Sequence, residues 1–158
     1  MTMRAASVKT IRRQPATPAD ETYQLEQQIG FVLRRATQRH VAIFAECMDE
    51  LGLTPTQFSA LIKIRDEGSI SQGRLGRLTS MDPTNILGVV QRLTQRGLVS
   101  RRPDPDDARS TLLTLTGAGQ ELLAQAVGRA REATERTLRP LPAAKRKALL
   151  QLLAKIAD

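Results

Sequence analysis

The residues of this chain best suited to covalent or metal chemistry are His40 and Cys47, its one histidine and its one cysteine. Nucleophilic catalysis requires a nucleophile and a base within about 3 Å of each other. Both residues fall in one predicted helix, and a rise of 1.5 Å per residue separates them by about 10.5 Å. They can therefore neither form a catalytic dyad within one chain nor share a zinc ion, whose ligands lie at about 2.0–2.3 Å.

Other catalytic patterns are missing from the sequence, which contains neither a Gly-rich phosphate loop nor a Ser nucleophile turn. The neighbouring carboxylates Asp106 and Asp107 fall in a predicted exposed loop, where nothing would bury them. An enzyme is therefore disfavoured, and we expect no cofactor and no metal site. The single cysteine also excludes a disulfide within the chain.

Polar side chains gather on one face of a predicted helix that opens at Asp82-Pro83. Asn and Gln can pair with adenine edges and Arg with guanine edges in the major groove, and a helix N-terminus can accept a phosphate. A solvated helix face explains the pattern equally well. The inward side chains are Ile86, Val89, Val90 and Leu93, and the outward residues are Thr84, Asn85, Leu87, Gly88, Gln91, Arg92 and Gln95.

The elements on either side of this helix favour the DNA-binding interpretation over a solvated face. A short helix capped by Ser71 precedes the polar helix, and Gly97 ends it. Residues 98–101 then predict a strand, 103–107 a loop, and 110–115 a second strand. Helix, turn, helix and a projecting β-hairpin are the parts of a winged helix-turn-helix, whose second helix enters the major groove.

The loop of this hairpin contains Asp107 and Arg109. A narrow minor groove attracts an inserted Arg, and Asp107 could hold Arg109 extended through a charge-assisted hydrogen bond. The alternative is an ordinary solvated hairpin turn. On the helix before the polar helix, Arg74 and Arg77 are expected to contact phosphates.

Long helices are predicted on both sides of this unit, from Glu21 to Leu51, from Thr116 to about Leu138, and from Ala143 to Ala157. The winged helix-turn-helix cannot cover all of the apolar stripes on these helices, so a partner is expected. A two-fold dimer is the commonest solution. The expected organisation is a disordered basic arm at 1–19, a helical dimerisation region at 20–51 and 116–158, and a winged helix-turn-helix at 52–115.

The fold class is therefore mainly α with a small β-hairpin. The formal net charge of +8 favours a polyanionic partner. No signal peptide and no membrane-spanning run is visible, so we expect a cytoplasmic protein without a membrane partner. The basic arm is interpreted as an unstructured terminus, with packing on a partner subunit or contact with DNA as the alternative.

The ordered set of motifs resembles the MarR family of bacterial transcription regulators over residues 22–157. The resemblance implies a homodimer that binds a palindromic operator in double-stranded DNA, usually as a repressor. It further implies release by a small, often phenolic or aromatic-acid, ligand. The motifs are Leu53-Thr54-Pro55-Thr56-Gln57-Phe58, Asp82-Pro83-Thr84-Asn85, Gly97-Leu98-Val99-Ser100-Arg101, and Asp104-x-x-Asp107-x-Arg109-Ser110 followed by Leu115-Thr116-x-x-Gly119.

The resemblance also implies a ligand pocket along the first helix, between the dimerisation region and the winged helix-turn-helix. His40 lies there on the apolar stripe and would pair with an anionic ligand, helped by Arg35 or Arg39. The apolar lining would come from Phe58 and Ile62, with Phe44 beside His40. The alternative is a core or interface histidine with a satisfied hydrogen bond.

Two positions depart from the family pattern. Gly88 stands in the recognition helix where a larger polar residue, often Arg, is expected, which puts the sequence preference in doubt. Gly30 stands where the hydroperoxide-sensing branch carries its reactive Cys, which argues against a thiol switch, although a pair of Cys47 residues between subunits stays open. A nonspecific architectural DNA-binding protein and a protein-binding winged helix are the alternative functions.

Overall fold

The computed structural model describes residues 23–105 and 110–157. The chain divides into two units, residues 1–35 and 36–158. The first unit holds a 3-10 turn η1 (Leu25–Gln27) and the beginning of helix α1 (Ile29–Cys47). Gln28 between them has an extended backbone, with φ −82° and ψ 130°. The expected helix start at Glu21 is therefore wrong, because an apolar spacing of three and four does not reveal one extended residue. Asp20, the first residue of the expected dimerisation region, lies outside the described residues.

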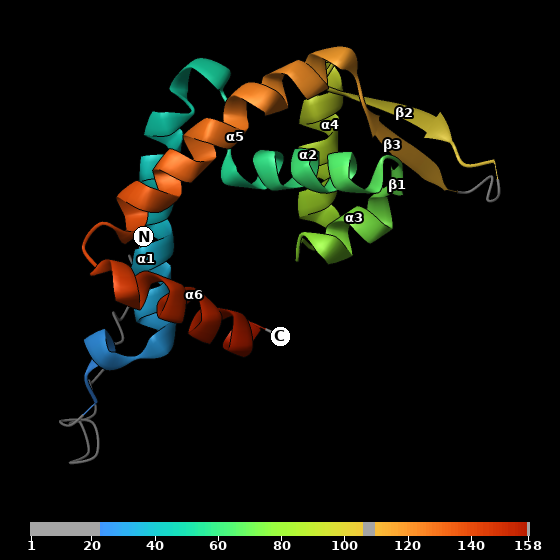
Figure 1. Cartoon of the computed structure of the whole chain (residues 1–158). Helices are drawn as coiled ribbons and strands as arrows, with labels where there is room; N and C mark the ends of the chain where they lie inside the picture. Colours follow the sequence, from blue (N-terminus) through green and yellow to red (C-terminus); the bar gives the residue numbers. More distant parts are fainter. Residues whose placement is uncertain (1–22, 106–109, 158) are drawn as a thin grey trace, which may run out of the picture. The chain divides into compact units, whose positions relative to one another are not determined.

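The first helix also ends earlier than Leu51. After Cys47 the chain tightens into a 3-10 turn η2 (Asp49–Leu51), and Gly52 stops it in the left-handed conformation with φ +56°. Left-handed backbone suits glycine, which has no β-carbon. The elements that follow are α2 (Pro55–Glu67), β1 (Ile70–Ser71), α3 (Gln72–Leu78), α4 (Pro83–Gln95), β2 (Val99–Pro103), β3 (Thr111–Leu115), α5 (Gly117–Leu138) and α6 (Ala143–Ala157) (Figure 1).

Side chains cap the starts of α2, α3, α4 and α5, and the predicted cap at Ser71 is confirmed. Thr54 forms a full capping box with Gln57, since its hydroxyl accepts from the Gln57 N–H while the Gln57 side chain accepts from the Thr54 N–H. Ser71, Asp82 and Thr116 accept backbone N–H groups at the starts of α3, α4 and α5. Each cap satisfies N–H groups that a helix leaves free in its first turn.

The predicted hairpin is confirmed, but it belongs to a three-stranded sheet of order β1-β3-β2. Antiparallel pairing of β2 with β3 places Val99 opposite Leu115 and Pro103 opposite Thr111. The first strand of the hairpin, β2, extends to Pro103, beyond the predicted end at Arg101. Since β2 is an edge strand, it tolerates a residue without an N–H. The sequence missed β1, since two residues are too short to show an alternating pattern.

The hydrophobic core is formed by the second unit. The inward residues predicted for α4 are confirmed: Ile86, Val89, Val90 and Leu93 are all buried. They pack with buried side chains of α2, α3 and β3, which include Leu61, Ile64, Leu75 and Leu113. This core fixes the roll of α4 about its axis and thereby decides which of its side chains face outward.

The start of α5 is attached to the end of the helix-turn-helix by a close backbone contact. Thr116 donates its hydroxyl to the Gly97 carbonyl at 2.6 Å, and its N–H donates to the Leu98 carbonyl at 3.1 Å. A β-carbon at Gly119 would lie 2.1 Å from that Leu98 oxygen. Only glycine permits this approach, which explains the Leu115-Thr116-x-x-Gly119 motif in physical terms.

Candidate nucleic-acid interface and effector region

Helix α4 presents a capped and polar N-terminus. The Asp82 carboxylate accepts the backbone N–H groups of Thr84 at 3.0 Å and Asn85 at 2.9 Å. The Asn85 side-chain amide also donates to the Asp82 carboxylate. The Asn85 backbone N–H holds the pKa of Asp82 below its usual value, assisted by the Asn85 amide and the Thr84 N–H. Asp82 therefore remains a carboxylate and fixes the Asn85 side chain at the first turn.

The outward face of α4 carries the side chains that the sequence placed there. Thr84, Asn85, Leu87, Gln91 and Arg92 are exposed. Gln95 is exposed as well, and Gly88 is half-buried beneath a neighbouring side chain.

That neighbour is Arg92, one turn later on the same helix. A β-carbon at Gly88 would lie 3.5 Å from Nη1 and 3.6 Å from Nη2 of Arg92. Side chains on a helix lean toward its N-terminus, so the guanidinium occupies the space that a side chain at position 88 would fill. Among the described residues, Arg92 has no ion-pair or hydrogen-bond partner, and its donors are free for a ligand.

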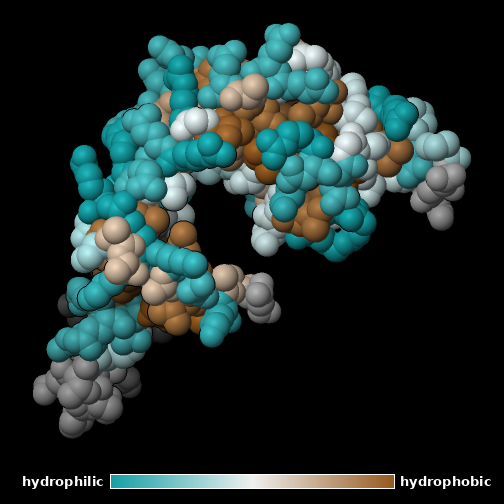
Figure 2. Space-filling model, in the orientation of Figure 1, coloured by the Kyte–Doolittle hydropathy of each residue, from teal (hydrophilic) through white to brown (hydrophobic). Residues whose placement is uncertain are grey.

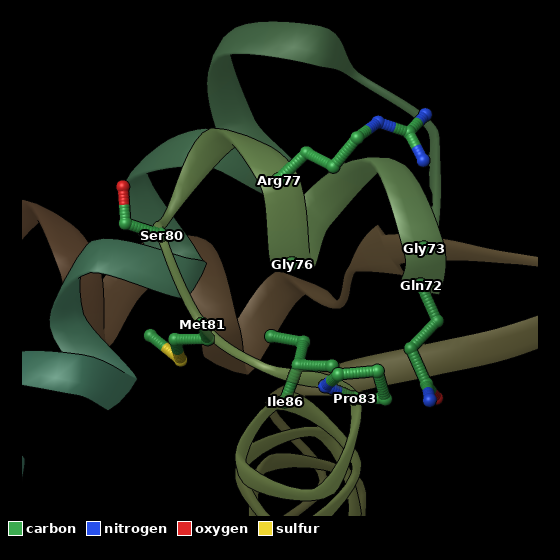
Figure 3. Close-up of a pocket in the computed structure, with 8 residues that line it drawn as sticks. All are labelled: Gln72, Gly73, Gly76, Arg77, Ser80, Met81, Pro83 and Ile86. Carbon is green, nitrogen blue, oxygen red and sulfur yellow. The ribbon is translucent and has the colours of Figure 1, made fainter. Parts of the chain in front are cut away.

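Helix α3 lies against the start of α4 around a cavity of about 370 Å³. Figure 3 shows Gly76 of α3 facing Met81 and Ile86, while the Arg77 side chain extends away from them. Within the described part of the chain, Arg77 has no charged or hydrogen-bond partner. The other predicted phosphate contact, Arg74, forms an ion pair with Glu67 at 2.8 Å.

The base of the hairpin contains two arginines that the sequence interpretation did not assign to DNA. Arg101 donates to the Gln72 side chain at the start of α3 at 3.2 Å, and Arg102 donates to Ser69 at 3.4 Å. Both guanidinium groups belong to exposed residues, and two adjacent basic residues before the loop were the available signal. The predicted tip residues Asp107 and Arg109 lie outside the described residues.

The residues predicted to hold an effector fall into two groups. His40 pairs through Nδ1 with the Thr137 hydroxyl of α5 at 2.9 Å, and Arg39 donates to the Thr137 carbonyl at 2.8 Å. The His40 ring lies 5.9 Å from Phe44, which lies 5.8 Å from Phe58. Arg39 and His40 are thus both engaged with α5, and an aromatic series connects His40 to α2.

The remaining predicted effector residues differ in their surroundings. Phe44 is buried, with 3% of its surface exposed, whereas Phe58 and Ile62 are half-buried and line a cavity between α2 and the end of α3. Arg35 lies with its Cζ 5.8 Å from the centre of the Phe31 ring.

Cys47 is part of the contact between α1 and α5. Its side chain is buried, and Arg136 donates to the sulfur at 3.4 Å. Arg136 also pairs with Glu46, and the hydrogen bond that it donates to the Glu46 carboxylate, followed by the one to Cys47, raises the pKa of the guanidinium. A buried thiol in this setting packs as a small apolar group.

Residues 23–105 and 110–157 contain neither a candidate membrane span nor a candidate metal cluster. Within these ranges, no helix has both the length and the apolar character needed to cross a membrane. Nor do three or more His, Cys, Asp or Glu side chains cluster there in a way that could hold a metal ion.

Comparisons with known proteins agree with this architecture. The sequence model of the MarR family matches residues 53–111. The chain is 40% identical over 144 residues to the HTH-type transcriptional repressor NicR of Pseudomonas putida, covering 90% of this chain and 91% of the relative. The chain belongs to the MarR family. This MarR-family chain therefore has a DNA-binding winged helix, and its relatives are transcription regulators.

Two solved structures extend the comparison. Bordetella bronchiseptica BpsR, described by the regulation of its DNA binding by 6-hydroxynicotinic acid, is 39% identical, with a TM-score of 0.81, over 86% of this chain and 97% of that one. The C80S mutant of MarR from E. coli, complexed with operator DNA, is 26% identical, with a TM-score of 0.76, over 82% of this chain and 94% of that one. The family likeness thus includes both a ligand-regulated and a DNA-bound protein.

Proposed function

We propose that this chain is a sequence-specific repressor that binds a palindromic operator as a homodimer and releases it when a small aromatic acid binds. The proposal rests on the outward face of α4, where the N-terminus is capped and the Arg92 guanidinium has no hydrogen-bond or ion-pair partner among the described residues. This face is therefore able to bind DNA. The residue assignments below follow from the contacts of each side chain.

Base reading is assigned to α4. Arg92 extends over Gly88 and would make a bidentate contact with a guanine. Gln91 and Asn85 would meet adenine or phosphate groups, and the exposed Leu87 can contact a thymine methyl group. Thr84 completes the reading face. On this proposal, Gly88 does not weaken base contact, because it makes room for the guanidinium of Arg92.

Phosphate contacts are assigned to the residues around α4. Arg77 has free donors, whereas Arg74 would have to exchange its ion pair with Glu67 for a phosphate. Arg101 and Arg102 at the base of the hairpin are added to this set on account of their exposure. Arg109, oriented by Asp107, stays a prediction for the minor groove.

The dimerisation region is assigned to the helices outside the winged helix-turn-helix. Helix α6 buries none of its residues, and Leu150, Leu152 and Ile156 are 52%, 62% and 63% exposed. Figure 2 shows apolar surface over the segment that Figure 1 labels α6. Large apolar side chains exposed to this extent favour a second copy of the chain as their cover.

The effector is proposed to be an aromatic carboxylate, and 6-hydroxynicotinic acid is the first candidate, because it regulates DNA binding by BpsR. Such a ligand would act by preferring the dimer state that does not fit the operator. The sequence-based candidates for its site are Arg35, Arg39, His40, Phe44, Phe58 and Ile62.

Fluorescence anisotropy tests this function. The full chain is titrated onto DNA from its own upstream region and onto a scrambled duplex at two salt concentrations. A specific repressor binds the upstream DNA at least about 10³-fold more tightly, with salt-dependent affinity, and 6-hydroxynicotinic acid lowers that affinity. Equal affinity for both duplexes would support an architectural protein, and no binding at either salt would support a protein-binding winged helix.

A further inference from the structure

A cavity of about 300 Å³ lies between α2 and the end of α3. Phe58, Ile62 and Lys63 line it from α2, and Leu78 and Ser80 line it from the α3 side. Sites for small ligands commonly have volumes of 300–1,000 Å³ and combine apolar walls with a few polar groups. This cavity is at the small end of that range, which suits a compound with a single ring.

The walls of the cavity differ in chemistry from one side to the other. Phe58 and Ile62 present half-buried apolar surface. Lys63 is also half-buried, and among the described residues it has neither an ion-pair nor a hydrogen-bond partner. An ammonium group beside apolar walls and without a counter-charge can form a charge-assisted hydrogen bond with an anionic ligand.

Two other residues proposed to hold an effector, Arg39 and His40, already have partners. Arg39 donates to the Thr137 carbonyl, and His40 pairs with the Thr137 hydroxyl. A ligand there would share both side chains with α5. Lys63 has no partner among the described residues, and it lines the same cavity as Phe58.

We propose that this cavity binds the effector, with the aromatic ring of the ligand against Phe58 and Ile62 and its carboxylate on Lys63. The inference rests on the proposed function, in which an aromatic acid releases the operator, and assigns the site at which that acid binds. Lys63 takes the role that sequence reasoning gave to Arg39 and His40.

The same geometry explains how the ligand acts on DNA binding. Ser80 lines both this cavity and the cavity between α3 and α4 shown in Figure 3. It has a positive φ of 53°, a strained conformation for a residue other than glycine. Asp82, two residues later, caps α4. A ligand against Ser80 therefore contacts the turn that sets the position of the reading helix.

The test compares ligand binding by the full chain, Lys63→Met, Lys63→Arg and a control, Arg65→Met on the exposed surface of α2. Calorimetry measures the affinity for 6-hydroxynicotinic acid and for its uncharged amide. Anisotropy on the upstream DNA, relative to each protein without ligand, measures release.

The expected result is that Lys63→Met loses about tenfold or more in affinity for the acid, as a charged hydrogen bond predicts, and binds acid and amide alike. Lys63→Arg retains the preference for the acid, and Arg65→Met matches the unsubstituted chain in affinity and release. Undiminished binding and release in Lys63→Met would overturn the site while leaving the proposed function intact. An unsubstituted chain that binds its upstream DNA specifically but neither binds nor responds to the acid would overturn both this site and the effector assignment.

Discussion

The guanidinium of Arg92 lies over the backbone of Gly88, so a β-carbon at Gly88 would lie 3.5 Å from Nη1 of Arg92. The two residues are one helical turn apart on the outward face of α4. The resemblance to the MarR family places a larger polar side chain at the position of Gly88. In this chain the guanidinium of Arg92, four residues later, fills that space.

Replacing Arg92 should therefore remove a base contact. Arg92→Ala is expected to weaken operator binding by about 1–3 kcal/mol, the value of a bidentate Arg–guanine contact, and to relax specificity at one base pair. Arg92→Lys should not restore it, since Lys lacks the planar fork. Competition anisotropy with single-base operator variants measures both effects.

Gly88 provides the matched control for this contact. Gly88→Ala should leave operator affinity within about threefold, because its β-carbon lies at ordinary contact distance from the Arg92 guanidinium. A change of about threefold is less than about 1 kcal/mol, since about 1.4 kcal/mol corresponds to tenfold. Gly88→Leu should displace the guanidinium and resemble Arg92→Ala. Full operator specificity in both Arg92→Ala and Gly88→Leu would assign base reading to other residues.

The cap at the start of α4 should make a pH-dependent contribution to stability. The folded-state pKa of Asp82 is lowered, first by the Asn85 backbone N–H, so its contribution is complete above its unfolded pKa of about 3.9 and is lost as pH falls through the lower folded value. Asp82→Ala should lower Tm by about 2–4 °C at neutral pH, and this difference should shrink below about pH 4.

Asp82→Asn separates capping from charge in the same experiment. Its amide oxygen can cap the helix but does not titrate, so its Tm at neutral pH should stay near that of the unsubstituted chain. Thermal unfolding followed by circular dichroism from pH 3 to pH 8 gives all three curves. A constant difference between Asp82→Ala and the unsubstituted chain down to pH 3 would contradict the role of the carboxylate.

Gly119 should tolerate no side chain. A β-carbon there would lie 2.1 Å from the Leu98 carbonyl oxygen, so Gly119→Ala must displace the start of α5 and should cost about 3 kcal/mol or more. Gly128, in the same helix, has nothing within 4 Å of the corresponding position. Gly128→Ala should therefore stabilise the chain by about 0.5–1 kcal/mol. Urea unfolding measures both, and equal effects would show that the close contact is not present in solution.

The apolar surface of α6 should be required for assembly. Leu152→Glu places a charge on a side chain that is 62% exposed in the single chain and should dissociate the proposed dimer, because burying an unpaired charge is costly. Gln151→Glu, on the neighbouring exposed position, adds the same charge as a control. Sedimentation velocity should show monomers for the first variant and dimers for the second. A dimeric Leu152→Glu chain would place the interface elsewhere.

Much of the fold could be predicted from local chemistry. Thr54, Ser71, Asp82 and Thr116 cap helices through their own side chains, so their roles are visible within four residues of sequence. The inward face of α4 follows from a helical period for the same reason. The extended residue Gln28 and the two-residue strand β1 could not be found, because neither alters a periodic pattern.

The site could be predicted only in part, since it depends on contacts between distant residues. The pairing of Arg39 and His40 with Thr137 joins positions about a hundred residues apart, and the cavity beside Lys63 requires α2 and α3 to pack together. The position of Arg92 over Gly88, by contrast, is local, but side-chain direction is not contained in the spacing of residue types.

Hydroxyl-radical footprinting of the full chain on its own upstream DNA measures whether a regulated dimer recognises a two-fold operator. We expect one protected region made of two half-sites whose centres are about 34 Å, or one turn of DNA, apart. We also expect 6-hydroxynicotinic acid to abolish the protection. Uniform protection along the DNA, or a footprint without two-fold symmetry, would contradict recognition of a two-fold operator.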